Sequence, residues 1–150
     1  CPPLNMYDED WQFFTRPRYL PMIKVHKSTI ENSDIAEGSI LEEARIVHSI
    51  VGLRSVIRKG TVLEDVVMMG NDYYEQQASC PVTGTGNVAL GIGKNCHIRK
   101  AIVDKNVRIG DNVKILNRSN AQDLENDYCV IRNGIVIIPK NTVIPPNTVI

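Results

Sequence analysis

The residues of this sequence best suited to chemistry are basic side chains that could converge on a small anion. Arg16 and Arg18 flank a proline, which keeps their two guanidiniums near each other on a stiff segment. Farther along the chain stand Arg99-Lys100, Lys105 and Lys140. Arginine and lysine converging from different segments is how a protein holds a sugar phosphate or another small polyanion. The alternative interpretation is an ordinary solvated charged face.

Other groups with chemical potential give weaker signals. The three histidines are separated by 22 and 49 residues, which does not stack them on a coil of about 18 residues, so we do not expect a zinc site. A single histidine without partner residues is a weak signal for a catalytic base, and we expect structural or surface histidines. No CxxC pair exists among the four cysteines, which we expect to be structural or incidental in a reducing compartment. The segment Gly84-Thr85-Gly86 matches neither common phosphate-loop motif and predicts a flexible loop. These residues are His26, His48, His97, Cys1, Cys80, Cys96 and Cys129.

Length and composition indicate one domain with an aliphatic core. The 150 residues are 43% hydrophobic but only 5% aromatic. Seventeen basic and seventeen acidic residues cancel, which argues against nucleic-acid binding by bulk charge and against a polybasic membrane surface. No apolar run is long enough to span a membrane, and the first ten residues do not resemble a signal peptide. The start CPPLNMYDEDW lacks an initiator Met, so we expect a fragment of a longer protein.

A six-residue repeat indicates which structural elements position these side chains. At the end of the chain, residues 138–143 (IPKNTV) are followed at once by residues 144–149 (IPPNTV), and five of six positions match. Lys140 is the third residue of its unit, and Lys105 holds the same position in the unit that Val103 opens. The two lysines are therefore predicted to project from equivalent corners.

The same phase runs through much of the chain. Aliphatic residues recur at steps of five or six, whereas a helix would place them at steps of three and four. We expect these aliphatic residues to point inward, with glycine and asparagine turning the corners because both tolerate left-handed backbone. The inward positions are Ile30, Ile35, Ile40, Ile46, Val51, Ile57, Val62, Ile92, Ile98, Val103, Ile109 and Ile115. The corner positions are Gly38, Gly52, Gly60, Gly93, Gly110, Asn95, Asn106, Asn112 and Asn141.

A hexad repeat of this kind predicts an all-β parallel β-helix, in which three short strands make one triangular coil and stacked coils bury a column of aliphatic side chains. The alternative is an antiparallel sandwich with accidental spacing. Three segments fall out of phase. Residues 1–28 are expected to be a lead-in packing on the first coil, and residues 69–91 and 117–133 are expected to be loops inserted into a β-helix domain of residues 29–150.

Several runs resemble the C-terminal part of the ADP-glucose pyrophosphorylase (glucose-1-phosphate adenylyltransferase) family. They are TRPRYLP at 15–21, HSIVGLRS at 48–55, MMGNDYYE at 68–75, IGKN at 92–95 and DKNVRIG at 104–110. The resemblance covers essentially the whole chain and implies a left-handed parallel β-helix. It also implies a separate N-terminal catalytic domain that binds Mg²⁺ with ATP. Neither the GGxGTRL loop nor the catalytic residues of that domain are found here, so no catalytic residue, cofactor or metal is expected in this chain.

The resemblance further implies an allosteric tetramer that makes ADP-glucose for glycogen or starch, in a bacterial cytoplasm or a plastid stroma. Partners would be the catalytic domain, like or unlike subunits, and a small phosphorylated effector such as 3-phosphoglycerate or phosphate. The family's activator lysines match Lys105 and Lys140, with Asp104 in the same motif. Its anion-binding TxPR segment matches Arg16 and Arg18, although relatives often carry Gln at the position of Arg16.

These observations predict a regulatory and assembly domain that is inactive by itself. Two other hypotheses remain open at this point. One is a hexapeptide-repeat acyltransferase that uses an acyl-CoA and a histidine at a subunit interface. The other is a free-standing interaction module.

Overall fold

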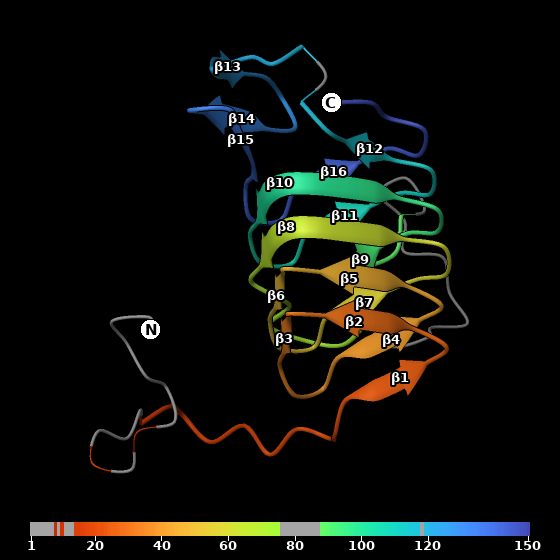
Figure 1. Cartoon of the computed structure of the whole chain (residues 1–150), viewed down its shortest axis with the longest axis vertical. Coiled ribbons are helices and arrows are strands. Elements are labelled where there is room, and N and C mark those ends of the chain that lie inside the picture. Colours follow the sequence, from red (N-terminus) through yellow and green to blue (C-terminus); the bar gives the residue numbers. More distant parts are fainter. Residues whose placement is uncertain (1–7, 9, 11–13, 76–87, 118) are drawn as a thin grey trace.

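The chain forms a three-sided prism of stacked coils. The computed structural model describes residues 8, 10, 14–75, 88–117 and 119–150. These residues form sixteen β-strands and no helix. The coils rise from a lead-in at the base to a short hairpin at the top (Figure 1). The predicted all-β parallel β-helix is confirmed, and the antiparallel sandwich was wrong.

One face of the prism is a six-stranded parallel sheet. Its strands are stacked in chain order, one from each coil. They are β1 (Lys24–His26), β4 (Ile40–Glu42), β7 (Val56–Ile57), β9 (Gly91–Ile92), β11 (Arg108–Ile109) and β16 (Val143–Ile144). β1 lies inside the segment 1–28 that we expected to be a lead-in, so the first strand of the prism precedes residue 29.

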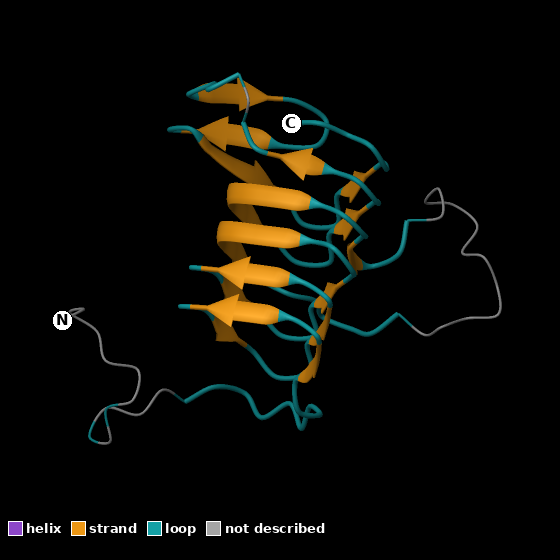
Figure 2. Ribbon diagram, turned by 45° about the vertical axis from the view of Figure 1, so that its right-hand side comes forward, coloured by secondary structure: helices purple, strands orange, loops and turns teal. Residues whose placement is uncertain are grey.

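The other two faces belong to one ten-stranded sheet that bends around a corner, as Figure 2 shows from the side. The second face carries β2 (Thr29–Glu31), β5 (Arg45–Val47) and β12 (Lys114–Ile115), and the third carries β3 (Asp34–Ile35), β6 (Ile50–Val51) and β15 (Ile135–Ile138). β8 (Val62–Met68) and β10 (His97–Val103) span both faces. They bend at Asp65 and Lys100, whose φ angles are 55° and 49°.

The core is three columns of in-register aliphatic side chains, one behind each face. In the first face Leu41, Ile57, Ile92, Ile109 and Ile144 stack rung by rung, and all are at most 1% exposed. Equivalent columns lie behind the second and third faces. They comprise Ile46, Leu63, Ile98 and Ile115, and Val51, Met68, Val103 and Ile138. The column of buried aliphatics explains how a chain with few aromatic residues forms a closed core.

Two predicted inward positions were wrong by one residue. Ile40 and Val62 are only partly buried, and the neighbouring Leu41 and Leu63 are fully buried instead. Alternate side chains on a strand point to opposite faces, so a shift of one residue turns an inward position outward. Ile30 and Ile35 are in register with buried residues of the next coil but stay partly exposed, because they lie in the first coil.

The corners confirm the predicted role of asparagine and correct that of glycine. All four predicted asparagines are left-handed, with φ from 54° to 62°. Gly38 and Gly60 are left-handed as well, whereas Gly52, Gly93 and Gly110 are not. These three are needed for close approach of the next coil. A Cβ on Gly110, for example, would lie 2.5 Å from the backbone nitrogen of Pro146.

The second out-of-phase segment forms strands rather than only a loop. β13 (Asp123–Glu125) and β14 (Val130–Arg132) pair antiparallel, and β14 pairs antiparallel with β15. The turn between β14 and β15 is Asn133-Gly134, with φ of 50° and 76°, the two left-handed residues that a tight hairpin requires. Of the first predicted loop, residues 76–87 lie outside the described part of the chain.

Candidate functional site

The lysine corner is the edge where β8, β10 and β15 end and where segments from three coils meet. We define it as Asp72, Lys105, Asn106 and Lys140. Because Met68, Val103 and Ile138 are in register, the segments that follow them stack as well. The amide of Asn106 donates to Gly70 O (3.2 Å), and the amide of Asn141 donates to Lys105 O (3.0 Å). Lys105 and Lys140 therefore occupy equivalent corners of adjacent coils, as their shared hexad position predicted.

Asp72 lies between the two lysines and binds both. Lys105 Nζ is 2.9 Å from Asp72 Oδ1, and Lys140 Nζ is 3.3 Å from Asp72 Oδ2. The hydrogen bond from Lys105, together with those from Asn106 and Lys140, lowers the pKa of Asp72 to about 2. Two ammonium groups around one carboxylate leave the corner with one excess positive charge. The three side chains are 40–50% exposed, so an anion in solution can reach them.

Asn106 fixes the carboxylate in place. Its Oδ1 accepts a hydrogen bond from the amide of Asp72 (2.8 Å), and its Nδ2 donates to Asp72 Oδ2 (3.0 Å). Asn106 is 7% exposed and left-handed, with φ of 59°, so its side chain turns back against the preceding coil. The same asparagine therefore both turns the corner and orients the acidic residue between the lysines.

The segment after Asp72 is tied along the prism by its side chains. Tyr74 Oη donates to Gly38 O (3.0 Å), and the Arg54 guanidinium lies 5.9 Å from the centroid of the Tyr74 ring. Glu75 accepts from Arg108 (2.6 Å) and from the amide of Leu90 (2.8 Å). These contacts anchor the backbone that follows Asp72, so the geometry of the lysine corner does not depend on exposed lysines alone.

Asp104 positions the backbone of the site. Its Oδ1 accepts a hydrogen bond from the amide of Lys105 (2.7 Å), and its own amide donates to Ile138 O (3.0 Å). In the described part of the chain, no ion pair joins Asp104 to either lysine. Asp104 therefore shapes the turn from which Lys105 projects, and Asp72 supplies the negative charge.

Arg16 and Arg18 do not join the lysines within one chain. Both are exposed, and Arg18 donates to Arg16 O (3.2 Å). The lead-in reaches the same edge of the prism at Pro21, whose carbonyl accepts from Gly38 in the first coil. Lys105 lies four rungs higher, roughly 19 Å along the prism at 4.8 Å per rung. The structure thus brings together two of the four predicted basic residues, Lys105 and Lys140.

The other described residues with reactive side chains contact neighbouring carboxylates or lie in the core. His48 Nδ1 lies 2.6 Å from Asp65, and His97 Nε2 lies 3.4 Å from Glu64. Cys96 and Cys129 are buried, and burial raises the pKa of both thiols.

Among the described residues, no three His, Cys, Asp or Glu side chains form a group that could hold a metal ion. Nor does that part of the chain contain a helix long and apolar enough to cross a bilayer. Cys1, Cys80 and the Gly84-Thr85-Gly86 segment lie outside it.

Sequence reasoning missed Asp72 and Asn106 as partners of the lysines. Asn106 was predicted as a corner residue, and Asp72 stood within a run that carried the family resemblance. The contact between Asp72 and Lys105 follows from the pairing of β8 with β10, which stacks the residues after Met68 on those after Val103. This pairing is hard to predict from the sequence, because the out-of-phase segment of residues 69–91 lengthens the spacing from Asp72 to Lys105 to 33 residues, which is more than one coil.

Comparison with known proteins agrees with this architecture. Residues 18–149 match the family model described as the GLGC left-handed parallel beta-helix domain, which gives the hand of the coil. The chain is also 44% identical over 152 aligned residues to the glucose-1-phosphate adenylyltransferase small subunit, chloroplastic/amyloplastic, from Triticum aestivum. The alignment covers 99% of this chain and 32% of that relative, so the chain spans about a third of the relative's length. The chain therefore belongs to the GLGC left-handed parallel beta-helix family, the C-terminal domain of glucose-1-phosphate adenylyltransferases.

Proposed function

We propose that this chain is the regulatory and assembly domain of an enzyme that makes ADP-glucose from ATP and glucose 1-phosphate. The family match supports this parentage over the acyltransferase and interaction-module hypotheses. The chemistry, with Mg²⁺ and ATP, would reside in a catalytic domain preceding these 150 residues. The name of the Triticum aestivum relative places that protein in plastids, and we propose the plastid stroma for this one, where ADP-glucose serves starch synthesis.

The regulatory part of this proposal is that the lysine corner binds a small phosphorylated effector. The observation that carries it is that lysines from two adjacent coils converge on a single carboxylate. Asp72 offers each lysine one oxygen. A phosphate or phosphate ester offers the same pair of acceptor oxygens and at least one more, with greater negative charge. An effector such as 3-phosphoglycerate would thus take over the lysine contacts that Asp72 makes without it.

Asp104 would shape this site through the amide of Lys105. We propose that Arg16 and Arg18 serve a separate anion contact at the junction with the catalytic domain, because four rungs separate their segment from Lys105. Charge reduction at the two places would then have different effects. Loss of a corner lysine would weaken effector binding directly, whereas loss of an arginine would act through the domain junction.

Effector binding can be measured by titration calorimetry of the full-length parent with 3-phosphoglycerate. Lys105→Ala and Lys140→Ala each remove one charge-assisted contact, and we expect affinity to fall about 10- to 150-fold. The matched control is Lys94→Ala, because Lys94 is an exposed lysine at the corner occupied by Asn95. Unchanged affinity in both corner variants would remove the case for this site.

Asp72→Asn gives an independent test of the exchange between Asp72 and the effector. The substitution keeps the shape of the side chain but removes the internal anion that neutralises the lysines. Effector affinity should therefore rise, and its dependence on salt should steepen because two full charges are then available. A loss of affinity would show that Asp72 supports the bound effector rather than competing with it.

The assembly part of the proposal rests on the open lower end of the prism. Val25 and Ile30 are 50% and 38% exposed, although they stack in register on the fully buried Leu41 and Ile46. These side chains need a cover, and the backbone of the first coil presents unpaired strand edges. We propose that subunits of a tetramer meet through the ends of their β-helices. Sedimentation showing only monomer at high micromolar concentration would count against it.

A further inference from the structure

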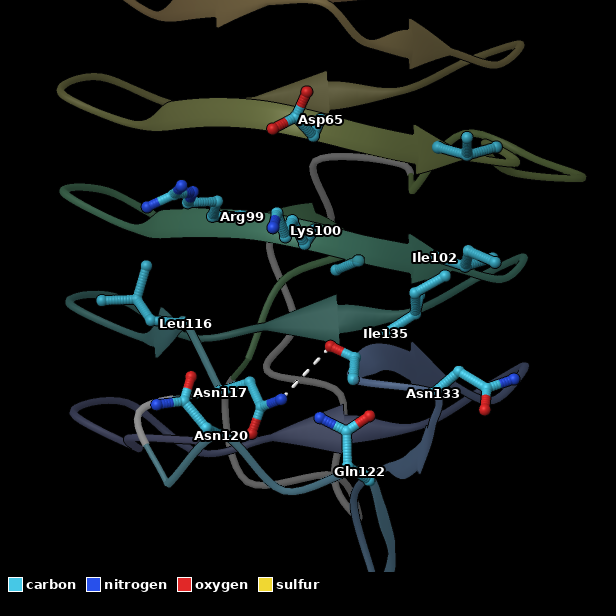
Figure 3. Close-up of a pocket in the computed structure, with 13 residues that line it drawn as sticks. Asp65, Arg99, Lys100, Ile102, Leu116, Asn117, Asn120, Gln122, Asn133 and Ile135 are labelled. Carbon is cyan, nitrogen blue, oxygen red and sulfur yellow. Dashed lines mark hydrogen bonds between the residues drawn. The ribbon is translucent and has the colours of Figure 1, made fainter.

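A second polar surface lies on the other edge of the third face, away from the lysine corner. A groove of about 690 Å³ opens there between β8, β10 and the β14–β15 hairpin. Figure 3 shows Arg99 and Lys100 above it, on β10, and the amides of Asn120 and Gln122 below. The groove thus combines cations with hydrogen-bonding groups from segments that meet only in the fold.

The two cations of the groove are available to a ligand. Neither Arg99 nor Lys100 makes an ion pair or a side-chain hydrogen bond with any residue that the structure describes, and both are exposed. Asp65 is the nearby acidic group, but its carboxylate is bound to His48 at 2.6 Å. The pKa of Asp65 is lowered, first by the hydrogen bond from His48 and also by the charges of Arg99 and Lys100. The groove therefore retains excess positive charge.

The opposite wall supplies amides held on a fixed frame. Asn117 is fully engaged, since it donates to Ala121 O (3.0 Å) and Gly134 O (3.2 Å) and accepts from the amide of Ala121 (2.9 Å). This arrangement fixes the turn that carries Asn120 and Gln122. The side chains of Asn120 and Gln122 themselves make no hydrogen bond to another described residue. Each offers a donor and an acceptor side by side, the pattern that pairs with neighbouring hydroxyl groups.

Aliphatic side chains complete the groove. Ile102, Leu116 and Ile135 line it between the cations and the amides, and Ile135 is 43% exposed. We propose that this groove binds a phosphorylated monosaccharide. Arg99 and Lys100 bind the phosphate, the amides of Asn120 and Gln122 bind ring hydroxyls, and the aliphatic side chains contact the C–H face of the ring. The site is separate from the lysine corner and does not depend on the effector proposal.

An NMR titration of the ¹⁵N-labelled chain with glucose 6-phosphate tests this site. We expect saturable shifts of the amides around Arg99–Ile102 and Asn133–Ile135. Arg99→Gln and Lys100→Asn should each weaken binding about 10- to 100-fold, because each removes one charge-assisted contact. Asn is chosen at position 100 because it tolerates the left-handed backbone there. Lys94→Ala is the control and should leave this affinity unchanged, because Lys94 is an exposed lysine outside both the groove and the lysine corner.

Two comparisons separate sugar recognition from simple charge. Gln122→Ala should weaken glucose 6-phosphate binding but leave the weaker binding of inorganic phosphate unchanged, because only the sugar carries hydroxyl groups. Glucose without phosphate should bind more weakly than glucose 6-phosphate. The proposal is overturned if no saturable shifts occur, if they centre on Lys105 and Lys140 instead, or if inorganic phosphate binds as tightly as the sugar phosphate.

Discussion

The register of the β-helix can be tested by comparing two neighbouring residues of β8. Leu63 is fully buried between Ile46 of the coil below and Ile98 of the coil above. Val62 is only partly buried, and it pairs with Arg45 and His97 on the outer surface. The repeat spacing favoured Val62 as the inward residue, whereas the structure assigns that position to Leu63. Leu63→Ala and Val62→Ala therefore give opposite results under the two registers.

The magnitude follows from the packing. Leu→Ala substitutions in protein cores cost about 2–5 kcal/mol, and more where the surroundings cannot collapse into the cavity. Leu63 lies between backbone-paired coils, which hold the cavity open, so we expect about 3–5 kcal/mol. For a chain of this length each kcal/mol lowers Tm by about 2–4 °C, which gives a decrease of roughly 6–20 °C. Val62→Ala removes partly exposed surface and should cost about 1 kcal/mol or less.

Thermal and urea unfolding, followed by circular dichroism on both variants and the wild type, measures these costs. The urea slope m should stay constant, so that the shift in midpoint reports stability alone. If Val62→Ala destabilises the chain as much as Leu63→Ala, or more, the register described here is wrong.

Three further predictions test other parts of the account. The carboxyl group of Asp72 should titrate near pH 2 by NMR; because this pKa lies below the ordinary value of 3.8, its stabilising effect is complete above pH 3.8 and is lost as the pH falls through 2, and a midpoint near 4 would show that the lysine contacts are absent. The 150-residue chain alone should release no pyrophosphate from ATP and glucose 1-phosphate above a buffer blank, and measurable release would contradict its assignment as a regulatory domain. Gly110→Ala should cost on the order of 1–3 kcal/mol, because its Cβ would meet the backbone of Pro146, and an unchanged Tm would disprove that close approach.

Much of the β-helix could be predicted from the sequence because its signals are local. The repeat places Ile109 and Ile144 in the core, and asparagines such as Asn106 and Asn141 mark left-handed corners. The two register errors arose because two adjacent aliphatic residues both fit a step of five or six. Ile40 and Val62 follow the preceding inward isoleucines, Ile35 and Ile57, by five residues, and the fully buried Leu41 and Leu63 follow them by six. One residue of slippage is then enough to replace an inward leucine by its outward neighbour.

The site was predictable only in part, because some of its contacts depend on the pairing of segments that lie far apart in the sequence. Lys105 and Lys140 share a position in the repeat, so their convergence follows from sequence. Asp72 lies within the out-of-phase segment of residues 69–91, and its contact with Lys105 depends on the long-range pairing of β8 with β10. The Asn133-Gly134 turn carried a local hairpin signal, but the polar residues before it favoured a loop. Long-range pairing, rather than local propensity, decides these features.

The most direct test of the central proposal is the activation of the full-length parent by 3-phosphoglycerate. The quantity to measure is the 3-phosphoglycerate concentration that gives half-maximal activation in the wild type, Lys105→Ala, Lys140→Ala and the control Lys94→Ala. The lysine corner predicts that this concentration rises about 10- to 150-fold in the two corner variants and stays at the wild-type value in the control. Equal sensitivity in all four proteins would contradict the assignment of Lys105 and Lys140 to an effector site.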